Sequence, residues 1–248
     1  MLSLLSRGRM EYALTAEGFT LAYNPLLHAN LLATGSLAGY EPVLQETIRH
    51  WTKPGMIAYD IGANVGVFSL LFYAMARPGN GRVFAFEPEP NNIACFERTL
   101  ARNDCPGIIL CRQAVSDAPG TAAFDRRGGA FSGRLVGRTQ GYSATLNIAQ
   151  VETISVDVCV FERGLPPPDI IKIDVEGNEG LVLEGMRGVL EKYHPIIICE
   201  LHTHLGDDGA RIREVLLQYG YEISALDACH IFCRYRDPGS PMPGDRRD

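Results

Sequence analysis

Two glycines and an asparagine follow directly after an apolar run near residue 60, where residues 60–66 read DIGANVG. Asp60 ends the apolar run, and Gly62 and Gly66 bracket the segment that follows it. A glycine in such a turn lets the backbone take unusual dihedral angles and lets a ligand approach closely. Residues 60–66 therefore predict a strand-to-helix turn that binds a ligand.

The nature of that ligand depends on the residue between the two glycines. Dinucleotide-binding proteins use a related turn with the pattern G-x-G-x-x-G, whose second glycine admits the pyrophosphate. Here Asn64 takes the place of that glycine, which argues against a nicotinamide dinucleotide. The acidic Asp60 suits a cofactor with a positively charged amino group and no pyrophosphate, and S-adenosylmethionine meets both conditions.

A second acidic residue, Glu87, ends the next apolar run, 25 positions after Gly62. A carboxylate at that place can accept hydrogen bonds from both ribose hydroxyls of a nucleoside cofactor. The end of the third apolar run falls where the adenine ring would lie. The candidate cofactor-binding residues are Asp60, Gly62, Ala63, Asn64, Gly66, Glu87, Pro88, Gln113, Ala114 and Asp174.

From residue 56 onward, short apolar runs alternate with segments of helical periodicity, which is typical of a parallel sheet covered by helices. Strands are predicted at residues 56–61, 82–87, 108–114, 169–174 and 196–201, then at 221–226 and 230–235, which suit an antiparallel hairpin. One helix is expected to carry Val182, Met186, Val189 and Tyr193 on a single stripe. We therefore expect an α/β fold with a Rossmann-like, seven-stranded mixed sheet, helices on both faces and a C-terminal hairpin.

Three segments are expected along the chain. Residues 1–55 form an N-terminal helical extension that packs on the core, in which Tyr40, Val43, Leu44 and Trp51 predict one amphipathic helix. Residues 56–236 form the cofactor-binding domain. The tail, residues 237–248, consists mainly of proline, glycine and charged residues and is expected to be disordered.

Composition narrows the classes of partner. The net charge of −6 argues against duplex nucleic acid, because phosphate binding needs a concentrated basic surface. Neither a signal peptide nor an apolar run of about 20 residues is present, so no membrane segment is expected. The seven cysteines are scattered and odd in number, which favours a reduced, cytoplasmic protein. Oligomeric state cannot be inferred from the sequence.

Four motifs in this order resemble the FkbM-type methyltransferases. They are YDIGANVG at residues 59–66, FEP at 86–88, IKIDVEG at 171–177 and ICELH at 198–202. The resemblance implies a class I methyltransferase fold, S-adenosylmethionine as methyl donor, and O-methylation of a small molecule or sugar in natural-product or glycan tailoring. Two features depart from the family pattern: Asn178 stands where many members have histidine, and residues 126–141 match no family segment.

Candidate acceptor-side groups come from the ends of the fourth and fifth strands, namely Asp174, Glu176, Glu200, His202 and His204. Methyl transfer to a hydroxyl requires that the nucleophile be positioned and its proton removed. His202, whose ordinary pKa lies near neutrality, is a candidate general base, although a structural role satisfied by a backbone carbonyl is also open. Asp174 is expected to position the donor or the acceptor, and Glu200 completes the catalytic candidates.

Two further interpretations concern the same region. Asp174, Glu200 and His202 together could hold a divalent metal ion that acidifies a bound hydroxyl, but their spacing matches no recognised metal motif and a metal-free site is favoured. Arginines 126, 127, 134 and 138 lie among glycines in a possible lid that could hold an anionic or sugar acceptor. A solvated loop is the other interpretation of that segment.

Two other functions stay open. One is a methyltransferase directed at nitrogen or carbon on another acceptor; the sequence lacks the N-P-P-[YF] type of motif expected for amino methylation. The other is a non-catalytic protein that binds the cofactor. The acidic residues and glycines of the cofactor motifs count against this second alternative.

Overall fold

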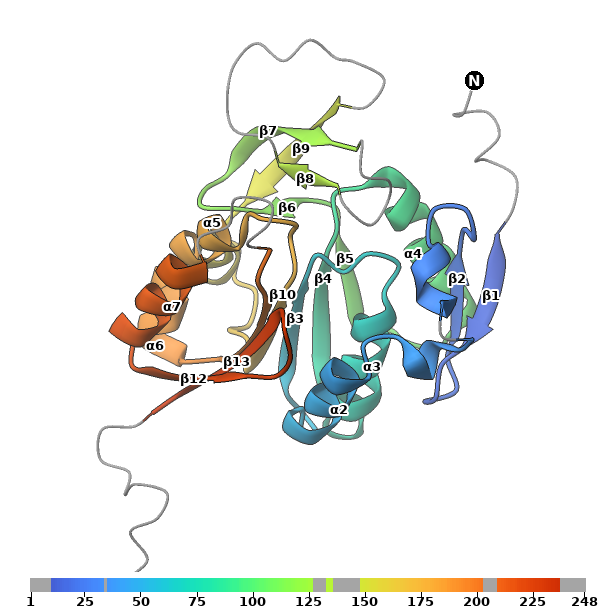
Figure 1. Ribbon diagram of the computed structural model, residues 1–248, viewed down its shortest axis with the longest axis horizontal. Helices are drawn as coiled ribbons and strands as arrows, with labels where there is room; N and C mark the ends of the chain where they lie inside the picture. Colours follow the sequence, from blue (N-terminus) through green and yellow to red (C-terminus); the bar gives the residue numbers. More distant parts are fainter. Residues whose placement is uncertain (1–9, 34, 127–132, 136–147, 203–208, 237–248) are drawn as a thin grey trace, which may run out of the picture.

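The main sheet has seven strands in the order β12–β13–β11–β10–β3–β4–β5 in this computed structural model, which describes residues 10–33, 35–126, 133–135, 148–202 and 209–236 (Figure 1). The bounds are Ile57–Ile61 for β3, Arg82–Phe86 for β4, Ile108–Cys111 for β5, Ile170–Ile173 for β10, Ile196–Glu200 for β11, Tyr221–Ala225 for β12 and His230–Tyr235 for β13. β13 is antiparallel to β11 and β12, and the other pairs are parallel. The predicted seven-stranded mixed sheet with its C-terminal hairpin is confirmed.

Strand order reverses at β3, which lies between β4 and β10. From β3 the chain continues to β4 and β5 on one side, and then crosses to β10 and β11 on the other. Such a reversal leaves a crevice at the carboxyl ends of the two central strands, because the connections leave in opposite directions. Asp60 on β3 lies opposite Lys172 on β10, so the two candidate motifs meet at this crevice.

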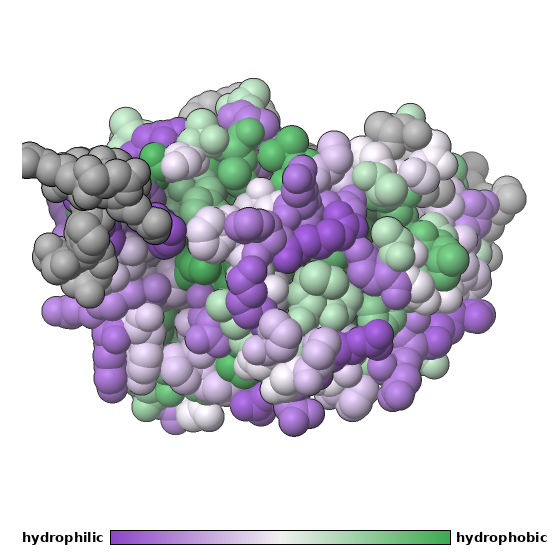
Figure 2. All heavy atoms as spheres, turned by 90° about the horizontal axis from the view of Figure 1, so that it is seen from below, coloured by the Kyte–Doolittle hydropathy of each residue, from purple (hydrophilic) through white to green (hydrophobic). Residues whose placement is uncertain are grey.

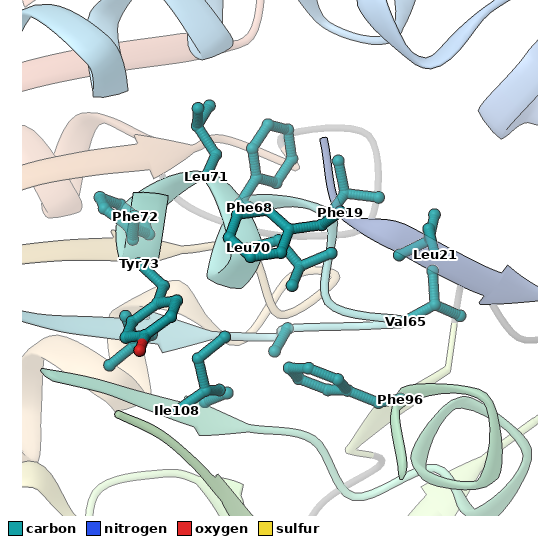
Figure 3. Packing of buried hydrophobic residues seen from close by; sticks show 14 of the residues in the cluster. Phe19, Leu21, Val65, Phe68, Leu70, Leu71, Phe72, Tyr73, Phe96 and Ile108 are labelled. Atoms are coloured by element: carbon teal, nitrogen blue, oxygen red, sulfur yellow. The ribbon is translucent and has the colours of Figure 1, made fainter. Parts of the chain in front are cut away.

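Helices cover both faces of the sheet, as predicted. One hydrophobic cluster contains Ala58 and Ile170 together with residues of α2 (Pro42–Trp51), α3 (Val67–Ala76) and α4 (Pro90–Arg102). The other contains Tyr59 and Ile171 together with residues of α5 (Glu179–Glu184), α6 (Arg187–Tyr193) and α7 (Gly209–Gln218). Neighbouring strand residues enter opposite clusters because side chains alternate across a strand. Figure 3 shows part of the first cluster, with Phe96 of α4 near Val65.

The N-terminal extension contains more than the expected helix. The predicted amphipathic helix is present as α2, although it begins after Tyr40 rather than including it. Before it, β1 (Glu11–Leu14) and β2 (Thr20–Tyr23) form an antiparallel hairpin, and short 3-10 helices span Ala29–Leu32 and Leu37–Gly39. The prediction that the N-terminal extension is helical is therefore wrong for residues 11–23, which contain two strands. In a strand of only four residues, the alternation of apolar and polar side chains is too short to predict the strand from sequence.

The hairpin is attached to the domain by hydrogen bonds to α4. The Thr99 hydroxyl accepts from the Ala22 N–H at 2.9 Å, and the Asn103 side chain bonds both backbone groups of Thr20 at 2.8 Å. Phe19 and Leu21 enter the first hydrophobic cluster beside α3 (Figure 3). These contacts support the expectation that the extension packs on the core.

A second, four-stranded sheet lies near the carboxyl ends of the central strands (Figure 1). Its strands are β6 (Ala114–Val115), β7 (Gly120–Asp125), β8 (Arg134–Leu135) and β9 (Ile148–Ile154), in the order β6–β9–β7–β8. The predicted third strand, residues 108–114, is therefore too long: β5 ends at Cys111, and Ala114 pairs with β9 in the second sheet.

The single helix predicted from residues 182–193 is also wrong, since α5 ends at Glu184 and α6 begins at Arg187. Gly185 separates the two, and a Cβ atom at this residue would collide with the carbonyl oxygen of Ser116. The carboxylate of Asp157 accepts hydrogen bonds from the N–H groups of Gly188 and Val189, both at 2.9 Å. The segment that follows β6 packs against Gly185, and the helix breaks there although the apolar residues continue at helical spacing.

The described residues include all seven cysteines of the chain. None of them forms a disulfide bond, and Cys199 is completely buried in β11. No helix in the described ranges is both long and apolar enough to cross a membrane. On the face shown in Figure 2, hydrophobic side chains lie scattered among hydrophilic ones.

We predict that Gly185→Ala lowers the free energy of unfolding by about 2 kcal/mol or more, because the added methyl group overpacks a site bounded by backbone. Gly180→Ala is the matched control. Gly180 lies in α5 with nothing near its Cβ position, so alanine there should be neutral or stabilise by up to about 1 kcal/mol. Urea unfolding followed by circular dichroism measures both; equal effects of the two substitutions would contradict the packing argument.

Candidate functional site

The turn after β3 is shaped by its contact with the end of β10. Gly62 has a φ of +79°, and a Cβ atom on it would collide with the backbone carbonyl oxygen of Asp174. Gly66, with a φ of +95°, lies against the ring of Phe96, which leaves no space for a side chain. Between them Asn64 has a φ of +52°, which asparagine tolerates better than most residues. Both glycines are thus required by protein packing in addition to any ligand.

Asp60 lies beneath the turn rather than on its surface. Its side chain is fully buried, accepts a hydrogen bond from the Ser69 hydroxyl at 2.5 Å, and lies 3.7 Å from the Lys172 ammonium group. Lys172 also donates to Asp174 at 3.0 Å and to the carbonyl oxygen of Gly62 at 3.3 Å. Burial alone would lower the pKa of Lys172, but the carboxylates of Asp174 and Asp60 raise it, so the ammonium stays charged. Asp60 therefore supports the turn through Lys172 and lines neither of the cavities described next.

One cavity, called here the Glu87 cavity, opens beside the end of β4. Glu87 is buried in its wall, where its carboxylate accepts hydrogen bonds at 2.8 Å from the N–H groups of Asn64 and Glu89. Burial raises the pKa of Glu87 to about 7. The cavity is lined by Gly62, Asn64, Phe86, Glu87, Pro88, Asn92, Ala114, Val115, Phe124, Gly133, Leu135, Asp174, Val175, Glu176 and Asn178. Residues of the second sheet thus close the side away from the turn.

A second cavity, called here the Glu200 cavity, lies on the other side of the Gly62 turn. It is lined by Asn30, Leu31, Tyr40, Glu41, Gly62, Asn64, Val65, Val67, Phe68, Lys172, Asp174, Glu176 and Glu200. Four residues, Gly62, Asn64, Asp174 and Glu176, line both cavities. The two cavities therefore meet at the carboxyl ends of β3 and β10, where the order of the strands reverses.

His202 is surrounded by carboxylates. Its Nδ1 lies 2.9 Å from the fully buried carboxylate of Glu179, and its Nε2 lies 3.5 to 3.8 Å from Asp174, Glu176 and Glu200. Burial alone would lower the pKa of His202, but the hydrogen bond to Glu179 and the surrounding charges raise it to about 9. Within the described residues, the contact of Nδ1 is the Glu179 carboxylate rather than the backbone carbonyl considered from sequence.

Glu179 also organises the loop that carries Glu176. Its Oε1 accepts hydrogen bonds from the N–H groups of Val175 and Gly177, at 3.1 and 3.2 Å. Glu176 has a φ of +57° and Gly177 one of +92°, both in the left-handed region. Burial and the nearby charge of Asp174 raise the pKa of Glu176 to about 7. A loop held in this sparsely populated conformation is common at functional sites.

Seven of the predicted cofactor-binding and catalytic residues line one or both of the two cavities. Glu87, Pro88 and Ala114 line only the Glu87 cavity, Glu200 lines only the Glu200 cavity, and Gly62, Asn64 and Asp174 line both. His202 is buried behind these residues and lines neither cavity. Ala63 and Gly66 lie in the turn without lining either cavity, and Gln113 instead donates to Glu152 at the surface. The sequence analysis missed Glu41, Asn92 and Glu179. Of these three residues, only Asn92 lies close in sequence to a motif that predicted the cofactor site, the FEP motif at residues 86–88.

Two features of the predicted acceptor side can be placed in part. Arg126 pairs with the buried carboxylate of Glu89, at the start of α4, so this guanidinium group has a structural partner. Residues 133–135 of the possible lid are described, with Arg134 at the start of β8. Residues 127–132 and 136–141, which include arginines 127 and 138, lie outside the described residues, as does His204. Asn178 donates to the carbonyl oxygen of Leu135 at 3.3 Å and so joins the β10 loop to the second sheet.

The three residues considered for a metal do come together. Asp174, Glu200 and His202 can each offer one ligand atom, and these atoms lie within 4.8 Å of one another. A second group of this kind consists of Glu200, Cys229 and His230. Glu200 is common to both groups.

Comparison with known proteins decides the family. The family model of the methyltransferase FkbM domain matches residues 60–223, well over half of the chain. This range contains the turn after β3 and the FEP, IKIDVEG and ICELH motifs. The chain belongs to the FkbM methyltransferase family. The resemblance stated from the four sequence motifs is thereby confirmed.

Two relatives that are about 30% identical to this FkbM-family chain are named as methyltransferases. It is 31% identical over 162 residues to the hexuronic acid methyltransferase AglP of Haloferax volcanii, a match covering 64% of this chain and 61% of that protein. It is 30% identical over 201 residues to the 31-O-demethyl-FK506 methyltransferase FkbM of Streptomyces tacrolimicus, covering 70% of this chain and 75% of that protein.

A solved structure supports the fold. The methyltransferase FkbM of Methylobacillus flagellatus aligns with a TM-score of 0.53 at 18% identity, over 73% of this chain and 44% of that one. The chain therefore spans less than half the length of that structure and about three fifths of the Haloferax protein. At this identity the alignment establishes the class I methyltransferase architecture and not the substrate.

Proposed function

We propose that this protein is an S-adenosylmethionine-dependent O-methyltransferase that acts on a hydroxyl of a small molecule or sugar. The observation that carries the proposal is the meeting of two cavities at the Gly62 turn, each with its own polar wall. A methyl donor and an acceptor must approach each other at one point from different sides, and the four shared residues surround such a point.

The Glu87 cavity suits the nucleoside part of the cofactor. The Glu87 carboxylate lies in its wall and has lone pairs left for the two ribose hydroxyls. Phe86, Val115 and Phe124 supply an apolar wall that suits the adenine ring. At the opening toward the second cavity, Asn64 Oδ1 is buried and has no hydrogen-bond partner within the described residues, so it can accept from the amino group of the cofactor.

The Glu200 cavity suits the acceptor. Bound S-adenosylmethionine supplies a methyl group on a sulfonium, whose sulfur keeps the C–S bonding electrons while the acceptor oxygen forms the new C–O bond. His202, held by Glu179, is the proposed general base that takes up the hydroxyl proton, and Asp174 and Glu200 are proposed to orient the hydroxyl. The positive charge of the cofactor favours the neutral imidazole that a base requires, because it opposes the surrounding carboxylates.

The names of the relatives support a hydroxylated acceptor. One of them is a hexuronic acid methyltransferase and another a 31-O-demethyl-FK506 methyltransferase, so both a sugar acid and a natural product are represented. We expect the same class of small-molecule or sugar acceptor here, and a cytoplasmic location stays a prediction.

We predict that Glu87→Gln weakens S-adenosylmethionine binding at least tenfold, because an amide offers one neutral acceptor where the carboxylate offers two charged ones. The affinity of the unchanged protein should fall as the pH drops below about 7, since the buried carboxylate becomes protonated there and loses acceptor capacity. Glu87→Gln should show a flatter pH profile. Isothermal titration calorimetry between about pH 5.5 and 8.5 measures both effects.

Glu97→Gln is the control for this experiment. Glu97 lies on α4, the helix that follows the FEP motif, but its side chain is exposed and forms a surface ion pair with Arg112. The affinity of this variant should equal that of the unchanged protein at every pH. If the unchanged protein binds no S-adenosylmethionine, the proposed function is wrong. Equal binding by Glu87→Gln would remove Glu87 from the cofactor site.

We predict that His202→Ala keeps the cofactor affinity within about threefold but lowers turnover by about a hundredfold or more, as expected for loss of a general base. The acceptor for this assay comes from a mass-spectrometric screen of sugars and hydroxylated small molecules. His50→Ala, at an exposed position of α2, should leave turnover unchanged. Full turnover in His202→Ala would exclude His202 from the mechanism.

A further inference from the structure

Part of the wall of the Glu200 cavity comes from outside the family domain. Asn30, Leu31, Tyr40 and Glu41 line this cavity and precede residue 60, where the match to the FkbM family model begins. The described residues that line the Glu87 cavity all belong to the matched range. The proposed donor side is thus built by the family domain, whereas the proposed acceptor side has a wall that this chain's own extension supplies.

Glu41 carries the charge of that wall and is held there at a conformational cost. It has a φ of +45°, a left-handed conformation that is uncommon for glutamate, and the following Pro42 restricts it further. A residue at the start of a helix often caps it with its side chain, yet Glu41 makes no such hydrogen bond. Backbone in a sparsely populated conformation is common at functional sites. Here it leaves the carboxylate in the wall of the cavity.

Carboxylates outnumber cations around the Glu200 cavity. The charged groups among its described lining residues are the carboxylates of Glu41, Asp174, Glu176 and Glu200 and the ammonium of Lys172. That ammonium is already engaged, because it lies 3.0 Å from Asp174 and 3.7 Å from the buried Asp60. The cavity therefore presents an excess of negative charge to whatever it binds.

Two imidazoles behind the wall do not remove this excess. Burial alone would lower the pKa of His230, but its contacts with Glu200 and Asp227 raise it to about 9, as for His202, so both rings are positively charged. Each ring also has a carboxylate partner that does not line the cavity. Glu179 lies 2.9 Å from Nδ1 of His202, and Asp227 lies 2.9 Å from Nδ1 of His230. These two pairs balance each other's charge, and the lining carboxylates stay in excess.

The pKa values of two lining carboxylates reflect this crowding. Burial raises the pKa of Glu41, and the charge of Asp174 adds to this effect. Burial and the same neighbouring charge raise the pKa of Glu176 to about 7. A positive charge in the cavity would lower both pKa values, so its binding is favoured, whereas a further negative charge would be repelled.

An aromatic surface adjoins these carboxylates. Tyr40 packs on Phe68 with ring centroids 5.8 Å apart, and both residues line the cavity. The ammonium of Lys172 lies 5.3 Å from the centroid of the Phe68 ring. Aromatic faces attract ammonium groups, so an aromatic pair beside carboxylates suits an organic cation.

We propose that Glu41 is a specificity-determining residue and that the acceptor of the Glu200 cavity is a hydroxylated compound with a protonated amino group, such as an amino sugar. The inference rests on the proposed function, because it names the acceptor class of that site. Glu41 attracts the ammonium group, and the lining carboxylates together repel an acceptor that carries a carboxylate. The bound ammonium also lowers the pKa of His202, which favours the neutral imidazole that takes up the hydroxyl proton.

The test compares compounds that share a scaffold and differ in one charged group. Glucose, glucosamine and glucuronic acid form one such triplet, with a neutral, an amine and a carboxylate member. Calorimetry measures their affinities for the full chain saturated with S-adenosylhomocysteine, over several triplets of hydroxylated compounds. We expect the amine members to bind at least about tenfold more tightly than the carboxylate members.

Glu41→Gln removes the charge with little change in shape. We expect this variant to weaken binding of the amine members at least about fivefold and to keep that of the neutral members within about twofold. Structural damage would instead weaken all members of a triplet alike. Glu41→Lys should shift the preference toward the carboxylate members. Glu46→Gln, at an exposed position of the same helix α2, should change none of these affinities.

Calorimetry with S-adenosylmethionine alone keeps this inference distinct from the proposed function, because that titration needs no acceptor. A chain that does not bind the cofactor refutes the proposed function. A chain that binds the cofactor, but binds amine members no better than carboxylate members or not at all, refutes the inference alone. An unchanged preference in Glu41→Gln also overturns it. Variants that keep the cofactor affinity are folded, and the preference of the unchanged protein tests the acceptor class without any variant.

Discussion

The close approach of the Gly62 turn to the end of β10 is the constraint on which the rest of the site depends. The backbone of Gly62 lies so near the Asp174 carbonyl that no side chain fits between them. Beneath this contact the Lys172 ammonium joins the Gly62 carbonyl and the carboxylates of Asp60 and Asp174. A buried ammonium among these groups is stable only while all of its partners stay in place, so it ties β3 to β10 at their carboxyl ends.

Because the two strand ends are joined in this way, the loops that leave them diverge and create a cavity on each side. The loop after β4 carries Glu87 into one cavity, and the ends of β11 and α2 carry Glu200 and Glu41 into the other. The two sides differ in character. The Glu87 cavity has an apolar wall from the second sheet, whereas carboxylates dominate the Glu200 cavity, whose only cation among the described lining residues is Lys172. This difference is what separates a nucleoside site from an acceptor site in the proposed function.

Much of the fold could be predicted from the sequence because the central strands are nearly continuous apolar runs with glycine or acidic residues at their ends. The same pattern located Gly62, Asn64, Glu87 and Asp174. It could not show that Asp60 faces inward, because its partner Lys172 is 112 positions away in the chain. Alternation along the strand does not decide toward which face of the sheet the Lys172 side chain points.

The residues missed by the sequence analysis share one property, which is that their partners are distant in the chain. Glu179 looks like an ordinary first-turn helix residue, yet it is completely buried and holds His202. Glu41 and His230 are 189 positions apart and meet only because the extension packs against the C-terminal hairpin. The break at Gly185 has a similar origin, because the carbonyl that causes it belongs to Ser116.

The most direct test of the account is a crystal structure of the protein with S-adenosylhomocysteine, the product of methyl donation. We predict that its ribose hydroxyls lie against Glu87 and that its sulfur lies among Gly62, Asn64, Asp174 and Glu176, facing the Glu200 cavity. A ligand bound in the reverse orientation, or outside both cavities, would contradict the claim that the Gly62 turn joins a donor site to an acceptor site.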